Sequence, residues 1–343
     1  MFDHFSNGDT DLNDLYDVYE AEFDPMKSDR KVRRQRKPKV KHNPKKSQAM
    51  ILEDIVDDDG IETGFQTTYK PGKYEAGWLL ESLTTFYSQK LIVDVLTQVK
   101  GGKEASVYLC EAHPNTGFDY LAAKVYRPRQ FRQLSNDQMY REGRAVLTET
   151  GTAVKETDHR VLRAIGKKSA FGQQVAHTSW LMYEFTTMQS LLNMGAAVPQ
   201  VIAAGENAIL MDYLGDENIA APTLSQMRLD LEEAAPLFDE VMRNVELMLA
   251  NGLIHGDLSA YNILYWAGEI TLIDFPQVTM AERNSNAYDI FARDVTRICE
   301  YFAAQGLHRD PEAITRRLWK RYVERPYHEQ MADLSRLEAQ EEE

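Results

Sequence analysis

The sequence predicts an α+β fold in two lobes, a small lobe rich in β-strands followed by a lobe made mainly of helices. Residues 99–109 read as a strand, a glycine-containing turn and a second strand, and short apolar runs at 121–126 and 208–214 indicate further strands. Apolar residues then recur at helical spacing through 224–249, and Asp-Pro at 310–311 is typical of a helix start. A chain of 343 residues with 43% hydrophobic content can bury a core in such a structure.

Two blocks of opposite charge precede the strands. Residues 1–26 are acidic and contain no Lys or Arg, whereas residues 27–46 are dense in Lys and Arg and contain only Asp29 as an acidic residue. Because such blocks bury little apolar surface, we expect residues 1–70 to be a disordered tail. The basic run is a candidate for binding RNA phosphates. The alternatives are a solvated tail, or one that folds back on acidic parts of the chain.

The tail leads into a small lobe that we place at 99–214, after a helical lead-in at 71–98. The lead-in is predicted because its apolar residues recur at helical intervals. Two glycines then separate the first two strands, and the backbone N–H groups of such a hairpin can lie over phosphates. A glycine pair alone is more often an ordinary hairpin turn. The candidate phosphate-binding residues here are Gly101, Gly102, Lys103, Ser106 and Val107.

One lysine, Lys124, interrupts the apolar strand Leu121–Tyr126. A lysine in such a strand is commonly solvated, but its neighbours resemble the strand in which a kinase lysine binds the α- and β-phosphates of ATP. This lysine needs a carboxylate to hold it in place. Glu184 lies in a stretch with helical spacing and is the best candidate, while a solvent-exposed helical Glu is the alternative.

Three oxygen-bearing side chains follow in a fixed order in the second half of the chain. Asp257 is followed five residues later by Asn262, and Asp274 comes after a short apolar strand. These are the groups needed to orient a hydroxyl or water and to hold Mg²⁺ on ATP phosphates, and protein kinases use this order. An ordinary Asp-capped acidic loop is the alternative. We therefore predict ATP and Mg²⁺ as cofactors, with Asp257, Lys124 and Glu184 as catalytic residues and Asn262 and Asp274 as metal ligands.

The kinase arrangement also predicts where the base of the nucleotide would lie. A buried strand from Ala208 ends in a connector at Leu214. Met211 would lie behind the adenine, and the backbone of Asp212, Tyr213 and Leu214 would bind its edge. Plain core packing is the alternative for Met211.

Taken together, the motifs resemble the RIO family of atypical protein kinases. Four segments carry the resemblance, in the order found in that family: Gly102–Tyr108, His255–Ser259, Asp274–Gln277 and Arg293–Val295. The resemblance implies a two-lobed, protein-kinase-like fold of RIO type and an ATP- and magnesium-dependent serine/threonine kinase, which phosphorylates a protein hydroxyl or itself. It also implies a link to ribosome maturation, which makes a ribosomal particle a candidate partner for residues 27–46. The sequence names no acceptor protein.

The chain departs from ordinary kinases after Asp274. No A-P-E triplet and no long activation segment follow, so we expect the peptide-binding platform of ordinary kinases to be missing. The alternative function is an ATPase-driven assembly factor with no protein substrate; an aspartyl-phosphate proposed in the family would fall on Asp274. The helical lobe is expected at 215–330, and residues 331–343 as a frayed acidic C-terminus.

Composition excludes several other classes of protein. The formal net charge of -14 argues against unspecific nucleic-acid binding by the whole protein. Cys110 and Cys299 form neither a metal-ligand spacing nor a disulfide framework, which favours a reducing compartment. The N-terminus lacks the features of a signal peptide, and no apolar run is long enough to span a bilayer. We therefore expect a cytoplasmic protein without a membrane partner.

Overall fold

The computed structural model describes most of the chain beyond the charged tail. The described residues are Phe65, 67–102, 104–127, 142, 144–155, 157–167 and 169–324. The expectations for the basic run 27–46 and for the acidic C-terminus 331–343 lie outside the described residues, as does most of the expected tail 1–70.

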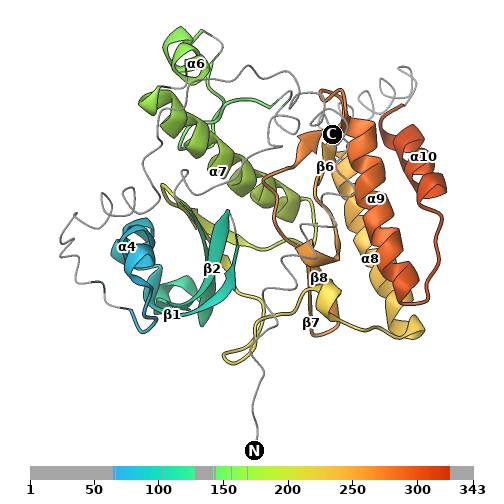
Figure 1. Ribbon diagram of the computed structural model, residues 1–343, viewed down its shortest axis with the longest axis horizontal. Helices are drawn as coiled ribbons and strands as arrows, with labels where there is room; N and C mark the ends of the chain where they lie inside the picture. The colour runs from blue at the N-terminus through green and yellow to red at the C-terminus, as the bar shows by residue number, and fades with distance from the viewer. Residues whose placement is uncertain are drawn as a thin grey trace, which may run out of the picture. The chain divides into compact units, whose positions relative to one another are not determined.

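The first lobe is a five-stranded antiparallel sheet with a helix packed against it (Figure 1). The strand order is β1-β2-β3-β5-β4, so β3 and β5 become neighbours although the helices α6 and α7 lie between them in the chain. The elements are α4 (Lys73–Ser88), β1 (Ile92–Gly101), β2 (Ala105–Ala112), η1 (Pro114–Thr116), β3 (Tyr120–Tyr126), β4 (Val201–Ala204) and β5 (Ala208–Asp212).

Helix α4 packs its apolar face on one side of this sheet. Leu79, Leu83 and Phe86 are fully buried there, in a core that also contains Tyr108 of β2. The Tyr108 hydroxyl donates a hydrogen bond to Glu75 in the first turn of α4. Because a buried tyrosine needs a partner for its hydroxyl, this contact fixes the start of the helix to the middle of the sheet.

The helical lead-in expected at 71–98 is only partly correct. The helix ends at Ser88, and β1 begins at Ile92 rather than at 99. Lys90 adopts a positive φ of 56°, which breaks the helix, and β-branched residues such as Ile92 and Val95 follow. These residues favour a pleated strand, so the apolar positions that fitted helical spacing belong to two different elements.

Two helices connect the central strand to the rest of the sheet, α6 (His159–Gly166) and α7 (Ala170–Asn193). They pack closely where Gly172 faces Ala164, since a Cβ on that glycine would lie 2.0 Å from the Ala164 carbonyl oxygen. Helix α7 contacts β4 and β5 and carries Glu184. The helix predicted around Glu184 is confirmed.

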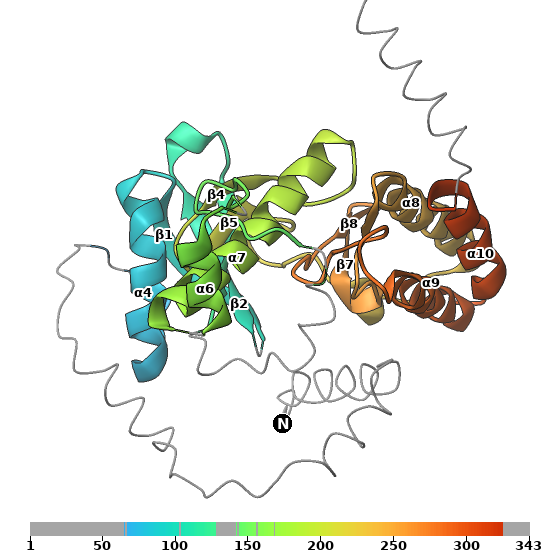
Figure 2. The ribbon, with the colours of Figure 1, turned by 90° about the horizontal axis from the view of Figure 1, so that it is seen from above.

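The second lobe is mainly helical, as predicted. Helices α8, α9 and α10 lie side by side (Figure 2). Asp310 caps α10 by accepting hydrogen bonds from the N–H groups of Glu312 and Ala313, as the Asp-Pro pair predicts. The elements are η3 (Leu224–Gln226), α8 (Leu231–Ala250), β6 (Leu253–Ile254), η4 (Ala260–Asn262), β7 (Ile263–Trp266), β8 (Glu269–Leu272), β9 (Thr279–Met280), α9 (Ala287–Ala304) and α10 (Pro311–Tyr322).

The two-lobed α+β prediction is therefore confirmed. Between Asp274 and the start of α9 at Ala287 the chain forms only the short strand β9 and turns. This stretch is fully described and is too short for a long activation segment or a separate peptide-binding platform. Within the described part of the chain, no helix has the length and apolar character needed to cross a membrane.

Candidate active site

Lys124 on β3 binds two carboxylates from distant parts of the chain. Its Nζ lies 2.6 Å from Glu184 Oε1 on α7 and 2.6 Å from Asp274 Oδ1 after β8. Burial lowers the pKa of the ammonium, but Asp274 and Glu184 outweigh this effect and hold the pKa above its ordinary value. Lys124 therefore stays positively charged, as its predicted role as a phosphate contact requires.

Glu184 is almost fully buried and accepts hydrogen bonds from three donors, two on β3 and one in the segment after β8. Besides Lys124, the Tyr126 hydroxyl donates to Oε2, and the Phe275 N–H donates to Oε1 over 3.4 Å. Tyr126 was not predicted as a site residue. The signal was present, because residues two apart on a strand share a face and Tyr126 stands two residues after Lys124.

The glycine turn between β1 and β2 has a conformation that suits a close approach to phosphates. A Cβ on Gly102 would lie 2.7 Å from the Ala105 carbonyl oxygen, so the turn requires glycine at this position. Gly101 pairs with Ser106 at the end of the ladder, and Val107 pairs with Lys124. Lys103 lies outside the described residues.

The Ser106 hydroxyl does not lie in this site, contrary to the expectation that it contacts phosphates. Ser106 is 1% exposed and pairs with Val125, which belongs to the core beneath α4. Side chains alternate between the two faces of a strand, so Ser106 points to the α4 side and Val107 to the side of Lys124. Of the two, only Val107 is placed to cover a nucleotide with its side chain.

Lys100 at the end of β1 is a second cation near the site, and sequence reasoning missed it. Burial lowers the pKa of Lys100, Asp274 opposes this effect, and the charge of Lys124 adds to it. The residue therefore lies within the electric field of both groups. A lysine next to a glycine turn gives no sequence signal beyond that of an ordinary surface residue.

The connector after β5 presents backbone groups beside the buried Met211. The Asp212 N–H donates to the Gln200 carbonyl, and the Leu214 carbonyl accepts from Ala221. Among the described residues the Leu214 N–H has no hydrogen-bond partner. Tyr213 stands between these two residues, with its ring edge-on to Tyr120. The connector can therefore offer a donor to the edge of a bound base.

Asp257 is held at both carboxylate oxygens. Oδ1 accepts a hydrogen bond from Arg297 Nη1 at 2.7 Å, and Oδ2 accepts from Asn262 Nδ2 at 3.2 Å. The same Asn262 nitrogen donates to the Asp257 carbonyl at 2.9 Å. Because its amide nitrogen is engaged with Asp257, the amide oxygen of Asn262 is the atom that remains to bind a metal.

The β7–β8 hairpin brings the two predicted metal ligands to the same end of the lobe. Ile263 pairs with Leu272, and the Ile273 N–H donates to the Asn262 carbonyl at 3.0 Å, so Asn262 and Asp274 flank the open end of this hairpin. Asp274 has a φ of 71°, a left-handed conformation that is uncommon for residues other than glycine and is typical of functional sites.

The side chain of Asp274 suits a metal ligand. It keeps 39% of its surface exposed. Burial raises the pKa of its carboxyl group, but Lys124 and Lys100 hold the pKa below its ordinary value, so the group is a carboxylate. No group of three or more His, Cys, Asp or Glu residues in the described structure could hold a metal alone. Two oxygen ligands fit Mg²⁺, which completes its shell with phosphates and water.

His255 lies between the segment that carries Asp257 and the segment that carries Asp274 and contacts both. Its Nδ1 accepts from the Asp257 N–H at 3.3 Å, and its Nε2 lies 3.2 Å from the Ile273 carbonyl oxygen. Since Nδ1 is an acceptor, Nε2 carries the proton and donates it. The ring packs on Phe275 at 4.8 Å. His255 thus connects the segment before Asp257 to the segment before Asp274.

Helix α9 holds the segment His255–Ser259, which carries Asp257 and is called the catalytic loop below. Asp294 accepts hydrogen bonds from the N–H groups of Gly256, at 2.8 Å, and Leu258, at 3.2 Å, and Arg293 donates to the Gly256 carbonyl. Burial raises the pKa of Asp294, although the positive charges of Arg293 and Arg297 and the hydrogen bond from the Gly256 N–H oppose this effect. The Arg293-Asp294 motif was recognised in the sequence, but its role in holding the loop was not.

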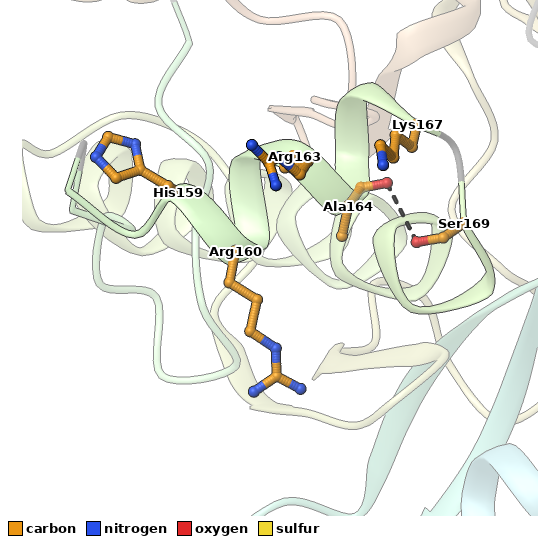
Figure 3. Close-up of a pocket in the computed structure, with 6 residues that line it drawn as sticks. All are labelled: His159, Arg160, Arg163, Ala164, Lys167 and Ser169. Atoms are coloured by element: carbon orange, nitrogen blue, oxygen red, sulfur yellow. Dashed lines mark hydrogen bonds between the residues drawn. The ribbon is translucent and has the colours of Figure 1, made fainter.

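A separate hollow of about 510 Å³ lies on α6 and contains none of the predicted site residues (Figure 3). Its lining is basic and comprises His159, Arg160, Arg163, Ala164, Lys167 and Ser169.

Comparisons with known proteins place the chain among one group of enzymes. A family model described as the RIO domain matches residues 138–314, which include α7 and the loops of Asp257 and Asp274. The chain is similar to the RIO-type serine/threonine-protein kinase Rio1 of Methanocaldococcus jannaschii, with 30% identity over 227 residues, or 65% of this chain and 68% of the relative. It is 28% identical to Rio1 of Haloferax volcanii over 218 residues, or 63% of this chain and 66% of the relative.

Among solved structures, the chain resembles the Rio2 kinase-ADP/Mg²⁺-phosphoaspartate complex from Chaetomium thermophilum. The TM-score is 0.48 at 19% identity, over 79% of this chain and 76% of that chain.

Proposed function

The chain belongs to the RIO family of atypical serine/threonine protein kinases, and from this premise we propose that its site transfers the γ-phosphoryl group of ATP, bound with Mg²⁺, to a protein hydroxyl or to the chain itself. The observation that carries this proposal is the convergence on Lys124. One ammonium binds Glu184 of α7 and Asp274 of the segment Asp274–Gln277, called the metal loop below, each at 2.6 Å. This contact joins the strands that would cover the phosphates to the loop that would hold the metal.

The nucleotide would bind between the sheet and the two loops. Its base would lie against Met211, with hydrogen bonds to the backbone of 212–214. Gly101, Gly102 and Val107 would cover the phosphates, and we retain Lys103 as a proposed phosphate contact. Lys124 would neutralise phosphate charge, with Glu184 holding its position.

Phosphoryl transfer itself requires positioning and charge stabilisation more than covalent chemistry by the protein. Mg²⁺ would supply the neutralisation of phosphate charge, and Asn262 and Asp274 would hold it. Asp257 would accept the hydrogen bond of the acceptor hydroxyl and take its proton late in the transfer.

A second function, that of an ATPase-driven assembly factor, is supported by the short connection from Asp274 to α9. An acceptor peptide has no platform on that stretch, so water is an alternative acceptor at the same site. We further propose a cytoplasmic protein that binds RNA or a ribosomal particle through residues 27–46. The density of Lys and Arg in that run supports the partner, and the free thiols of Cys110 and Cys299 support the compartment.

The substitution Asp257→Asn tests the proposal. Asp257 acts on the acceptor, so turnover should fall by about 10²-fold or more while ATP affinity changes little. Radiolabelled ATP measures phosphoprotein and free phosphate separately, which distinguishes the kinase from the ATPase. Wild-type turnover in the variant would refute the catalytic role.

A further inference from the structure

Four charged side chains lie buried beneath the catalytic loop, two of each sign. Asp257 belongs to the loop, and Arg293, Asp294 and Arg297 belong to α9. Arg297 is 1% exposed and Asp257 is 8% exposed, and the two form an ion pair of 2.7 Å. Buried ions are expensive unless each has a partner, so this pairing is the condition under which Asp257 can be buried as a carboxylate.

A positively charged side chain that pairs with Asp257 cannot come from the preceding position in the loop, which is Gly256. Gly256 has a φ of 85°, and a Cβ there would lie 2.3 Å from the Gln277 carbonyl oxygen. No side chain fits between the catalytic loop and the metal loop at this point. The cation is instead provided by Arg297, 40 residues further along the chain and on the opposite side of the loop.

We propose that Arg297 is a positioning residue for phosphoryl transfer, which fixes the direction of the Asp257 carboxylate. This inference rests on the proposed catalytic role of Asp257. Arg297 holds Oδ1 while Asn262 holds Oδ2, so the carboxylate cannot rotate about its terminal bond. Each carboxylate oxygen has two lone pairs, so an oxygen that already accepts one hydrogen bond can accept a second one from the acceptor hydroxyl.

Arg293 provides a matched comparison on the same helix. It is also buried, but it donates to the Gly256 carbonyl and lies 3.6 Å from Asp294 Oδ1. Arg293 therefore holds the backbone of the loop, whereas Arg297 binds the carboxylate itself. Replacing either arginine should lower the melting temperature. Only for Arg297 should the size of this decrease depend on the charge of residue 257.

The first test is kinetic and uses the full chain with MgATP. We expect Arg297→Met to lower kcat by about 10²-fold, because misplacing a reacting group by about 1 Å has an effect of this size. The KM for ATP should stay within about threefold, since Arg297 binds Asp257, which we propose acts on the acceptor and not on ATP. Arg297→Lys should recover at least tenfold of the lost kcat, because it restores the charge at one oxygen. A kcat within threefold of wild type for Arg297→Met would overturn the proposal.

The second test measures the melting temperature and does not depend on enzymatic activity. Arg297→Met should lower it strongly in the wild-type background and far less in an Asp257→Asn background, where no buried carboxylate is left unpaired. Arg293→Met should lower it equally in both backgrounds. Equal losses for Arg297→Met in both backgrounds would overturn the pairing. Full turnover by Asp257→Asn alone would instead refute the proposed catalytic role, so the two failures are distinguishable.

Discussion

Replacing Gly256 by alanine should destabilise the protein and stop turnover through a single close contact. The residue has a φ of 85°, and a Cβ there would lie 2.3 Å from the Gln277 carbonyl oxygen. Real Cβ atoms essentially never approach an oxygen within 3.0 Å, so one of the two loops must move. Gln277 stands three residues after Asp274, and the catalytic loop carries Asp257, so either movement displaces a residue of the site.

The loss of stability caused by Gly256→Ala has two contributions, and a substitution at a second glycine measures one of them alone. Gly252 has a φ of 69°, but a Cβ there meets nothing within 4 Å. Gly252→Ala should therefore cost only the left-handed conformation, about 1–2 kcal/mol. Gly256→Ala should cost the same plus about 1–3 kcal/mol for overpacking between the loops.

The assay compares the free energy of unfolding in urea with the rate of ATP turnover. Gly252→Ala should keep its turnover, because Gly252 touches no residue of the site. Gly256→Ala should lose turnover by more than its stability loss explains, measured at a temperature where both variants are folded. If both variants lost the same stability and kept the same activity, the close approach of the two loops would have no functional role.

Three further predictions concern the nucleotide site and the tail. Tyr126→Phe removes one hydrogen bond to the buried Glu184, which should lower the free energy of unfolding by about 2 kcal/mol and reduce kcat/KM; unchanged values in urea unfolding and in turnover would contradict the contact. Asp274→Ala should weaken ATP binding in Mg²⁺ but not in EDTA, as measured by nucleotide titration; a loss in both conditions would speak against a ligand role. Deletion of residues 1–64 should leave turnover within a few-fold and, if the basic run binds RNA, remove a salt-sensitive gel shift; RNA binding that survives the deletion would argue for a solvated tail.

Local patterns in the sequence predicted the parts of the site that depend on strand and helix spacing. Glu184 could be located because its neighbours have helical spacing, and the structure places it 2.6 Å from Lys124. The start of β1 at Ile92 was missed because apolar residues on a helix and on the following strand can together imitate one helical pattern. Ser106 was placed in the site although strand alternation turns its side chain toward α4.

Contacts between distant residues could not be predicted in this way. Arg297 lies 40 residues from Asp257, and nothing in its own neighbourhood marks it as a partner of a carboxylate. Lys100 and Asp274 are similarly far apart in sequence. Such relations depend on how α9 packs against β6 and η4 and on where the strands place their ends, which a single sequence does not specify residue by residue.

The two carboxylates on Lys124 have a consequence for the order in which ligands enter. The single positive charge of Lys124 already forms ion pairs with both Glu184 and Asp274. A phosphate that approaches this ammonium competes with Asp274, whose carboxylate would then face further negative charge without a counterion. The competition ends only if a divalent cation binds together with the phosphate and coordinates the Asp274 carboxylate in place of Lys124. We therefore expect the nucleotide site to bind metal-free ATP less tightly than MgATP, because of this charge balance, and to admit the nucleotide and its metal as one unit.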